Sequence, residues 1–238
     1  MKSILPNFTI VIPVYNEADV IPEQTKKLVS QLEKQKINDW ELIFVENGSN
    51  DQTKEAAKKI CKQYPKVRLI ILPKAEYGTA IKEGIKNSVY PFVILFNIDY
   101  WSITFLRKSL IFMKSNPSYD IVLASKTHDE STDSRPLQKR VVTIFFNKFI
   151  LKKIFRYPGT DTHGIKTFRK TIRPLMEKCY SKHFIFDTEL LLKAKQNKFK
   201  IKEFPIEIKE LRKSPSNIIR RIRITIIDLG KIIFKLKN

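Results

Sequence analysis

Short apolar runs recur along the first half of the chain and alternate with longer stretches in which apolar residues follow helical spacing. Short runs rich in β-branched residues predict strands, whereas the longer stretches predict helices. The predicted strands are Phe8–Val14, Glu41–Val45, Val67–Leu72, Phe92–Phe96 and Asp120–Ala124, and the predicted helices are Ala18–Lys34, Gln52–Gln63, Thr79–Asn87 and Ile103–Ser115. This alternation predicts an α/β fold, with a mostly parallel sheet covered by helices on both faces.

The pattern changes after Ser125, where basic and aromatic residues become frequent. Pro205 cannot donate a hydrogen bond within a sheet, so the strand that contains it is expected at an edge or a bulge. The predicted elements are a mobile polar loop over Thr127–Pro136, a basic and aromatic helix over Val141–Ile154, a helix over Asp187–Gln196, a strand over Lys200–Ile208 and a terminal helix from about Ser216 to Leu236.

No stretch has the pattern of a membrane span or a leader. The longest apolar stretch, Val141–Phe155, contains three lysines and is shorter than the roughly 20 apolar residues that a spanning helix needs. The run Phe8–Val14 is interrupted by Pro13 and lacks the basic region and cleavage site of a secretory signal. We therefore expect one folded unit with no spanning segment.

Composition adds a strong charge asymmetry. The 238 residues are 42% hydrophobic, which excludes a disordered chain, and carry a formal charge of +21, of which residues 1–100 supply only +2. The second half should therefore face something anionic: nucleic acid, an acidic membrane surface or a phosphorylated substrate. No helix-turn-helix, zinc-finger or aromatic RNA-binding motif is present in the sequence, so nucleic acid is not the expected partner. Two cysteines form neither a disulfide framework nor a zinc cluster, which favours a reducing, cytoplasmic compartment.

Polar residues follow three of the predicted strands. In an open parallel sheet, ligands bind beyond the carboxyl ends of the strands. The segments there are Pro13-Val14-Tyr15-Asn16-Glu17, Glu46-Asn47-Gly48-Ser49-Asn50-Asp51 and Asn97-Ile98-Asp99. Such loops can accept hydrogen bonds from a nucleobase and ribose, and an acidic pair can hold a divalent cation against a diphosphate. The alternative for a single loop is structural: Asp51 caps a helix, and Asn16 and Glu17 form a turn.

The ordered set of motifs resembles the family-2 glycosyltransferases, and within them the dolichol-phosphate (polyprenyl-phosphate) mannose or glucose synthases. The match covers residues 8 to about 216. The resembling segments are Phe8–Glu17, Val45–Asp51, Tyr77-Gly78-Thr79-Ala80 with Gly84, Asn97-Ile98-Asp99 at the Asp-x-Asp motif, Asp161–Phe168, Phe186–Leu190, and Glu203-Phe204-Pro205-Ile206 with Arg212. Asn97 and Asn47 stand where the family has aspartates, and His163 replaces a serine and receives no role.

The resemblance implies a GT-A fold over residues 1–215, with a nucleotide-sugar half (1–100), an acceptor half (101–215) and an amphipathic basic helix over 216–238. It implies a GDP- or UDP-sugar donor and Mg²⁺ or Mn²⁺ at Asn97 and Asp99. The implied nucleotide-sugar residues are Pro13, Tyr15, Asn16, Glu17, Val45, Glu46, Asn47, Gly78, Asn97, Ile98 and Asp99.

The resemblance also implies inverting sugar transfer, with Asp99, Asp187, Glu189 and Arg212 as catalytic candidates. Lys126, Arg140 and Arg212 are expected at the acceptor phosphate or the leaving diphosphate, because lysine and arginine bind phosphate. A polyprenyl phosphate acceptor is already anionic and needs no strong base. A sugar hydroxyl would need a carboxylate to take its proton, and Asp99, Asp187 or Glu189 would do so.

The terminal helix is the second expected contact with something anionic. Apolar residues fall on one side and basic residues on the other, which predicts a helix in an anionic membrane interface or, alternatively, one that packs on this domain or a partner. The apolar residues of this helix are Ile218, Ile222, Ile226, Leu229, Ile233 and Leu236. We expect a peripheral protein on the cytoplasmic face of a membrane.

Two other functions remain open: transfer to a cell-surface glycan, and a decayed protein that only binds nucleotide sugars.

Overall fold

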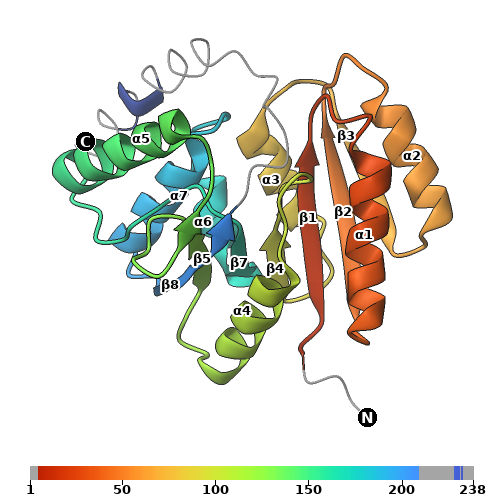
Figure 1. Cartoon of the computed structure of the whole chain (residues 1–238), viewed down its shortest axis with the longest axis horizontal. Coiled ribbons are helices and arrows are strands. Elements are labelled where there is room, and N and C mark those ends of the chain that lie inside the picture. Colours follow the sequence, from red (N-terminus) through yellow and green to blue (C-terminus); the bar gives the residue numbers. More distant parts are fainter. Residues whose placement is uncertain (1–4, 209–227, 231, 233–238) are drawn as a thin grey trace.

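The structure is a computed structural model that describes residues 5–208, 228–230 and 232 (Figure 1). In its first half, strands and helices alternate as the apolar pattern predicts, with boundaries that shift by a few residues. The elements are β1 (Phe8–Val14), α1 (Ile21–Lys34), β2 (Trp40–Asn47), α2 (Thr53–Gln63), β3 (Val67–Leu72), α3 (Tyr77–Lys86), β4 (Phe92–Leu95) and α4 (Ile103–Ser115).

The second half is less regular. Its elements are β5 (Ile121–Ser125), β6 (Thr132–Asp133), α5 (Leu137–Phe145), the π-helix η1 (Phe146–Ile154), β7 (Lys166–Arg169), the 3-10 helix η2 (Lys170–Ile172), α6 (Arg173–Glu177), α7 (Phe186–Gln196), β8 (Ile201–Pro205) and β9 (Glu207–Ile208). The predicted helix over Val141–Ile154 therefore begins earlier, and its second part is a π-helix.

One seven-stranded sheet runs through both halves, in the order β3-β2-β1-β4-β7-β5-β8. β1 is parallel to β2 and β4, with Val14 opposite Glu46 and Val11 opposite Leu95. β7 runs antiparallel between β4 and β5, and β8 is parallel to β5 at the edge where Pro205 was expected. The predicted mostly parallel α/β sheet is confirmed, and the carboxyl ends of β1, β2 and β4 lie along one side of it (Figure 1).

Two expectations need correction. β7 is not predicted, because it is only four residues long and Lys166 interrupts its apolar pattern. The polar segment Thr127–Pro136, expected as a mobile loop, contains β6, which pairs in parallel with β9. Ser131 ties this segment down further, since its hydroxyl donates to the Ser125 carbonyl at 2.6 Å and accepts the Ile206 N–H at 3.0 Å.

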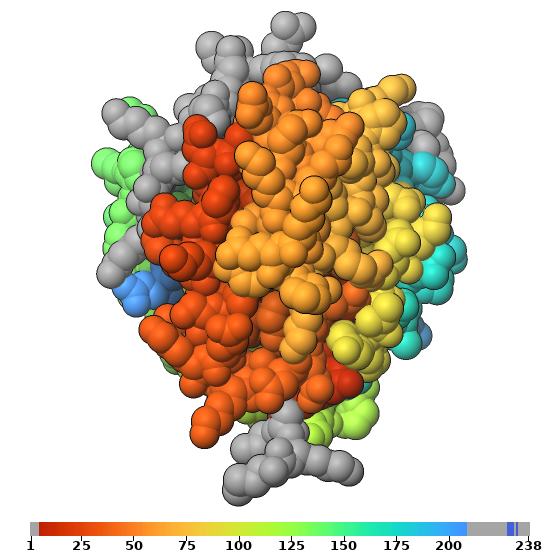
Figure 2. Space-filling view, turned by 90° about the vertical axis from the view of Figure 1, so that its right-hand side faces the viewer, coloured from red at the N-terminus to blue at the C-terminus, as the bar shows by residue number. Residues whose placement is uncertain are grey.

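The sheet separates two hydrophobic core clusters. The first contains apolar residues of α1, α2 and α4, and the second contains those of α3, α6 and α7. Every residue of β2 is buried, as expected for a strand covered on both faces. Figure 2 looks toward the β3 edge, where N-terminal residues, coloured red to yellow, form most of the visible surface.

Arg212 and most of the predicted terminal helix lie outside the described residues. Asp228–Gly230 and Ile232 are helical. Leu229 and Ile232 are buried in the second core cluster. Of the two alternatives for this helix, the residues that can be described fit packing against the domain. In the described part of the chain, no helix is both long and apolar enough to span a bilayer.

Gly164 provides a test of the packing between β5 and the segment before β7. A Cβ atom there would overlap the carbonyl oxygen of Ala124, whereas a Cβ on Gly230 would meet open space. We expect Gly164→Ala to lower the free energy of unfolding by about 3 kcal/mol, because the clash is with backbone that cannot rotate away. Urea unfolding measures this, and Gly230→Ala, expected to change stability by less than about 1 kcal/mol, is the control. Equal stabilities of the two variants would contradict this packing.

Candidate active site

The loops after β1 and β2 are joined into one rim by hydrogen bonds. Asn16, whose φ is +55°, accepts the Asn50 N–H through its side-chain oxygen at 2.9 Å. Its own N–H donates to the Ser49 hydroxyl at 3.1 Å, and the Glu17 N–H donates to Thr53 Oγ1 at 2.7 Å. The predicted convergence of these two strand ends is therefore present in the structure.

Asp51 has both a local and a cross-loop role. Its carboxylate accepts the N–H of Thr53, the first residue of α2, at 3.0 Å. It also accepts the Ala18 N–H from the other loop at 3.3 Å. Asp51 therefore binds the start of α2 from the residue before its N-cap, Gln52, and the same side chain helps to close the rim.

Three predicted nucleotide-sugar residues at the end of β2 are buried. Val45 lies in the second core cluster. Glu46 accepts the Ser49 N–H at 2.6 Å, and Asn47 accepts the Glu76 N–H at 2.8 Å. These two side chains shape the loops around the crevice through bonds to backbone.

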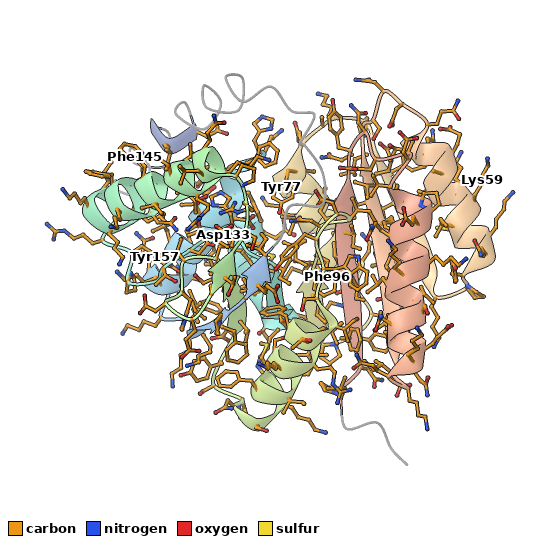
Figure 3. The ribbon with its side chains drawn as sticks, viewed as in Figure 1. Lys59, Tyr77, Phe96, Asp133, Phe145 and Tyr157 are labelled. Carbon is orange, nitrogen blue, oxygen red and sulfur yellow. The ribbon has the colours of Figure 1, made fainter. Side chains whose placement is uncertain are left out.

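Gly78 brings the start of α3 against the segment that precedes α7. Its N–H donates to the Lys182 carbonyl at 2.8 Å. A Cβ at this position would overlap the Ser181 carbonyl and the Phe186 ring. The close approach places Tyr77, the preceding residue, beside α7, at the boundary between the two halves in Figure 3.

Asn97-Ile98-Asp99 forms a tight turn after β4. Two backbone hydrogen bonds between Asn97 and Tyr100, at 3.2 and 3.1 Å, close it. Ile98 is buried in the first core cluster and anchors the turn, while Asn97 is exposed and Asp99 half-buried. Because the Phe96 N–H donates to the Val11 carbonyl, this turn follows directly from the pairing of β4 with β1. Pro13 is half-buried and Tyr15 exposed at the end of β1.

The turn fits a cation that is shared with a ligand. Within the described residues, no three His, Cys, Asp or Glu side chains are grouped to form a metal cage. Mg²⁺ is commonly held by one or two carboxylates together with substrate phosphates. One carboxylate, Asp99, and one amide oxygen, Asn97, therefore suit a cation that takes its remaining ligands from a diphosphate and water.

The acceptor half contains a cluster of buried, paired charges. Lys126 Nζ lies 2.8 Å from Asp161 Oδ2, and Lys166 Nζ lies 3.0 Å from Asp187 Oδ1. The side chains of these four residues are 1% to 8% exposed. Tyr77 donates its hydroxyl to Asp187 Oδ2 at 3.2 Å, so each Asp187 oxygen faces a partner. We call Lys126, Asp161, Lys166 and Asp187 the paired-charge cluster.

The cluster shifts the ionisation of its members. Burial alone would raise the pKa of Asp161, but the Lys126 ammonium and the His163 N–H hold that pKa well below its usual range. Burial lowers the pKa of Lys166 against the opposing effect of Asp187. Burial raises the pKa of Tyr77 well above its usual value, and the Asp187 charge adds to this, so the phenol remains a donor.

His163 lies beside this cluster. Its ring packs edge-on against Phe146 of η1, with ring centroids 5.5 Å apart. Surrounding protein atoms lower the pKa of His163, while Asp187 and Asp161 oppose that shift, and part of the side chain stays open to solvent. The imidazole is therefore favoured in its neutral form at neutral pH.

The other predicted acceptor-side residues are placed differently. Glu189 is buried, and its carboxylate accepts the N–H groups of Tyr180 and Ser181 at 2.8 to 3.0 Å, so it holds the loop before α7. Arg140 is exposed on α5. Arg212 lies outside the described residues. The structure thus joins Lys126 and Asp187 to one cluster and assigns Glu189 a structural contact.

Lys166, Tyr77 and Asp161 were not selected as site residues from the sequence. The sequence did contain a signal for Lys166. A lysine inside the short segment Gly164–Phe168, if buried, needs a counter-ion, because an unpaired ammonium in a core is very costly. The sequence could not identify that counter-ion as Asp187, which lies on a separate element. The role of Tyr77 depends on the close approach at Gly78.

The fold is that of the GT-A class of nucleotide-diphospho-sugar transferases. Residues 9–178 match the model of glycosyl transferase family 2, and the chain belongs to that family. It is a glycosyltransferase.

Comparison with individual proteins agrees with this. The chain is 27% identical over 234 residues to the dolichyl-phosphate beta-glucosyltransferase ALG5A of Trichomonas vaginalis, covering 94% of this chain and 72% of that protein. A mannosyltransferase of Pyrobaculum calidifontis, solved with GDP-Man and Mn²⁺, superposes with a TM-score of 0.62 at 16% identity, over 92% of this chain and 61% of that one. Glucosyl-3-phosphoglycerate synthase of Mycobacterium tuberculosis, solved with Mn²⁺, UDP and phosphoglyceric acid, gives 0.64 at 15% identity, over 92% and 74%.

The Lys126–Asp161 pair predicts a pH-dependent stability. Asp161→Asn should lower the free energy of unfolding at neutral pH by about 3 kcal/mol, because Lys126 is left buried without its counter-ion. Because the folded state lowers the pKa of Asp161, its contribution is present above the ordinary carboxyl pKa of about 4 and is lost as the pH falls through the folded-state pKa. The difference in the free energy of unfolding between wild type and variant should therefore become smaller in acid. Urea titrations at several pH values measure it, with the exposed Asp19→Asn as control. A difference in unfolding free energy that does not change with pH would contradict the pairing of Asp161 with Lys126.

Proposed function

We propose that the chain transfers a hexose, with inversion, from a GDP- or UDP-sugar to a polyprenyl phosphate at the cytoplasmic surface of a membrane. The family membership supports the donor class, and the names of the dolichyl-phosphate glucosyltransferases support the acceptor class. The basic excess of the second half favours an acceptor that carries negative charge.

The observation that carries the acceptor assignment is the state of the two buried carboxylates. Asp187 Oδ2 accepts the Tyr77 hydroxyl, while Oδ1 faces the Lys166 ammonium at 3.0 Å and accepts no hydrogen bond within the described residues. Glu189 accepts two backbone N–H groups. A sugar hydroxyl needs a carboxylate that is available to take its proton. A phosphate oxygen is already anionic near neutral pH, so it can attack without such a base. With Asp99 proposed as the cation ligand, the partners of Asp187 and Glu189 therefore favour a phosphate over a hydroxyl acceptor.

The transfer itself requires few covalent changes. An oxygen of the lipid phosphate attacks the anomeric carbon, the new C–O bond forms, and the bond to the nucleoside diphosphate breaks on the opposite face. The diphosphate leaves with the bonding electron pair, and the anomeric configuration is inverted. Asp187 is held in place by Lys166 and Tyr77, and the joined loops that carry Asn16 and Ser49 would position the donor.

Asn97 and Asp99 would hold a divalent cation at the donor diphosphate. A bound cation would stabilise the negative charge of the leaving diphosphate. The Mn²⁺ in the two related solved structures supports this assignment. Asn97 supplies only a neutral oxygen, so the cation depends on Asp99 for protein charge.

The acceptor class can be tested directly. The protein is incubated with radiolabelled UDP-glucose or GDP-mannose, Mg²⁺ or Mn²⁺, and either a polyprenyl phosphate or the matching polyprenol. We expect an organic-soluble labelled product with the phosphate and none with the alcohol, because only the phosphate brings its own anionic nucleophile. Equal labelling of the alcohol, or label only in a water-soluble glycan, would contradict the proposal.

If Asp99 is a cation ligand, Asp99→Asn should lose most of its transferase activity. Removing the carboxylate should lower kcat by about 100-fold or more and raise the Mn²⁺ concentration needed for half-maximal rate, because the leaving charge loses its stabilisation. Initial rates at varied Mn²⁺ measure both effects, and Asp19→Asn is the control. Full activity of Asp99→Asn at low Mn²⁺ would exclude Asp99 as a ligand.

A further inference from the structure

The continuous helix of α5 and η1 turns a row of large apolar side chains toward solvent. No residue of α5 is buried. A surface helix normally turns its apolar stripe toward the core, so this arrangement is unusual. The exposed side chains, 43% to 70% accessible, are Leu137, Val141, Val142, Ile144, Phe145, Phe149 and Ile154, which we call the apolar face of α5–η1.

The opposite side of η1 is fixed to the domain. Asn147 and Leu151 are buried beneath it. The Asn147 amide donates to Thr127 Oγ1 at 3.0 Å and to the Thr160 carbonyl at 2.7 Å. Because this side of the helix packs against the domain, the apolar face of α5–η1 is turned toward solvent.

The charges of the helix itself are all of one sign. Residues 137–156 contain six basic side chains and no acidic one. Phe145 and Phe149 stack with ring centroids 4.9 Å apart, and Lys153 Nζ lies 4.7 Å from the Phe149 ring centre. Lysines whose stems run along apolar surface while their ammonium groups reach outward are typical of helices in a membrane interface.

The apolar face of α5–η1 also lies on the side of the molecule where the proposed function requires a lipid acceptor. α5 lies along the upper edge in Figure 1, toward which β1 points, and Phe145 is labelled on it in Figure 3. η1 contacts His163 through Phe146, and the His163 N–H donates to Asp161 of the paired-charge cluster. A membrane against this face would therefore lie next to the paired-charge cluster.

We propose that the apolar face of α5–η1 is the surface by which this chain docks onto an anionic lipid bilayer. A second copy of the chain is a poorer occupant, because symmetric pairing would place six like charges of each copy against those of the other. This surface would bring the proposed transferase to its lipid acceptor, and only that purpose rests on the proposed function. Binding to the bilayer itself needs neither donor nor acceptor.

The test is sedimentation of the full chain with vesicles of equal parts phosphatidylcholine and phosphatidylglycerol, without nucleotide sugar. The double variant Phe145→Ser/Phe149→Ser should bind about tenfold or more weakly, because it loses two inserted aromatic rings. The matched control Val89→Ser/Ile111→Ser also removes two exposed apolar side chains, one from the loop between α3 and β4 and one from α4, and should bind as wild type does. Vesicles of phosphatidylcholine alone, or high salt, should weaken wild-type binding.

A second readout separates docking from catalysis. With a short, water-soluble prenyl phosphate, the Phe145→Ser/Phe149→Ser variant should transfer sugar at the wild-type rate, whereas transfer to a long polyprenyl phosphate in vesicles should fall. Unchanged vesicle binding by the folded variant would overturn the proposal, as would a wild-type dimer in analytical ultracentrifugation that this variant converts to monomers. Docking without any sugar transfer would instead contradict only the proposed function.

Discussion

Two buried lysine–aspartate pairs are the interactions on which the acceptor half depends. Lys126 at the end of β5 is paired with Asp161, and Lys166 in β7 with Asp187 in α7. Each pair is worth little as net stabilisation, because burying charge is costly, but breaking one leaves an ion without compensation. The Lys126–Asp161 pair joins the segments that follow β5 and precede β7, and the Lys166–Asp187 pair joins β7 to α7. Backbone pairing places β7, antiparallel, between β4 and β5.

This arrangement connects the fold to the chemistry. Because β7 joins β4 to β5, the turn that bears Asp99 and the strand that bears Lys166 belong to one rigid sheet. Tyr77 reaches Asp187 only because glycine at position 78 lets α3 approach the loop before α7. Backbone packing thus sets the positions of the rim and of the paired-charge cluster, and Asp187 and Glu189 already have partners. Such a site suits a nucleophile that is anionic before it binds.

Much of this could be predicted from the sequence, and the exceptions have physical causes. The strands around β1 are long apolar runs buried on both faces, so their pattern is unambiguous, and the parallel-strand rule then places Tyr15, Glu46 and Asn97 on one side of the sheet. β7 is short and carries a lysine whose burial depends on a residue 21 positions later in the chain. The spacing of motifs also indicates which loops converge but not which atoms their side chains bond. Glu46 and Asn47 were expected around the nucleotide sugar, and nothing in the sequence indicated that each also accepts a backbone N–H.

The central claim is that the nucleophile brings its own charge, so that Asp187 orients the site and takes no proton. Its most direct test is the pH dependence of the single-turnover rate with polyprenyl phosphate, compared between wild type and Asp187→Asn. The account predicts one rising limb near the second phosphate pKa of about 6, with the same shape in both proteins even if the variant is slower. A limb that is present in wild type and absent from the variant would make Asp187 a proton acceptor and contradict the account.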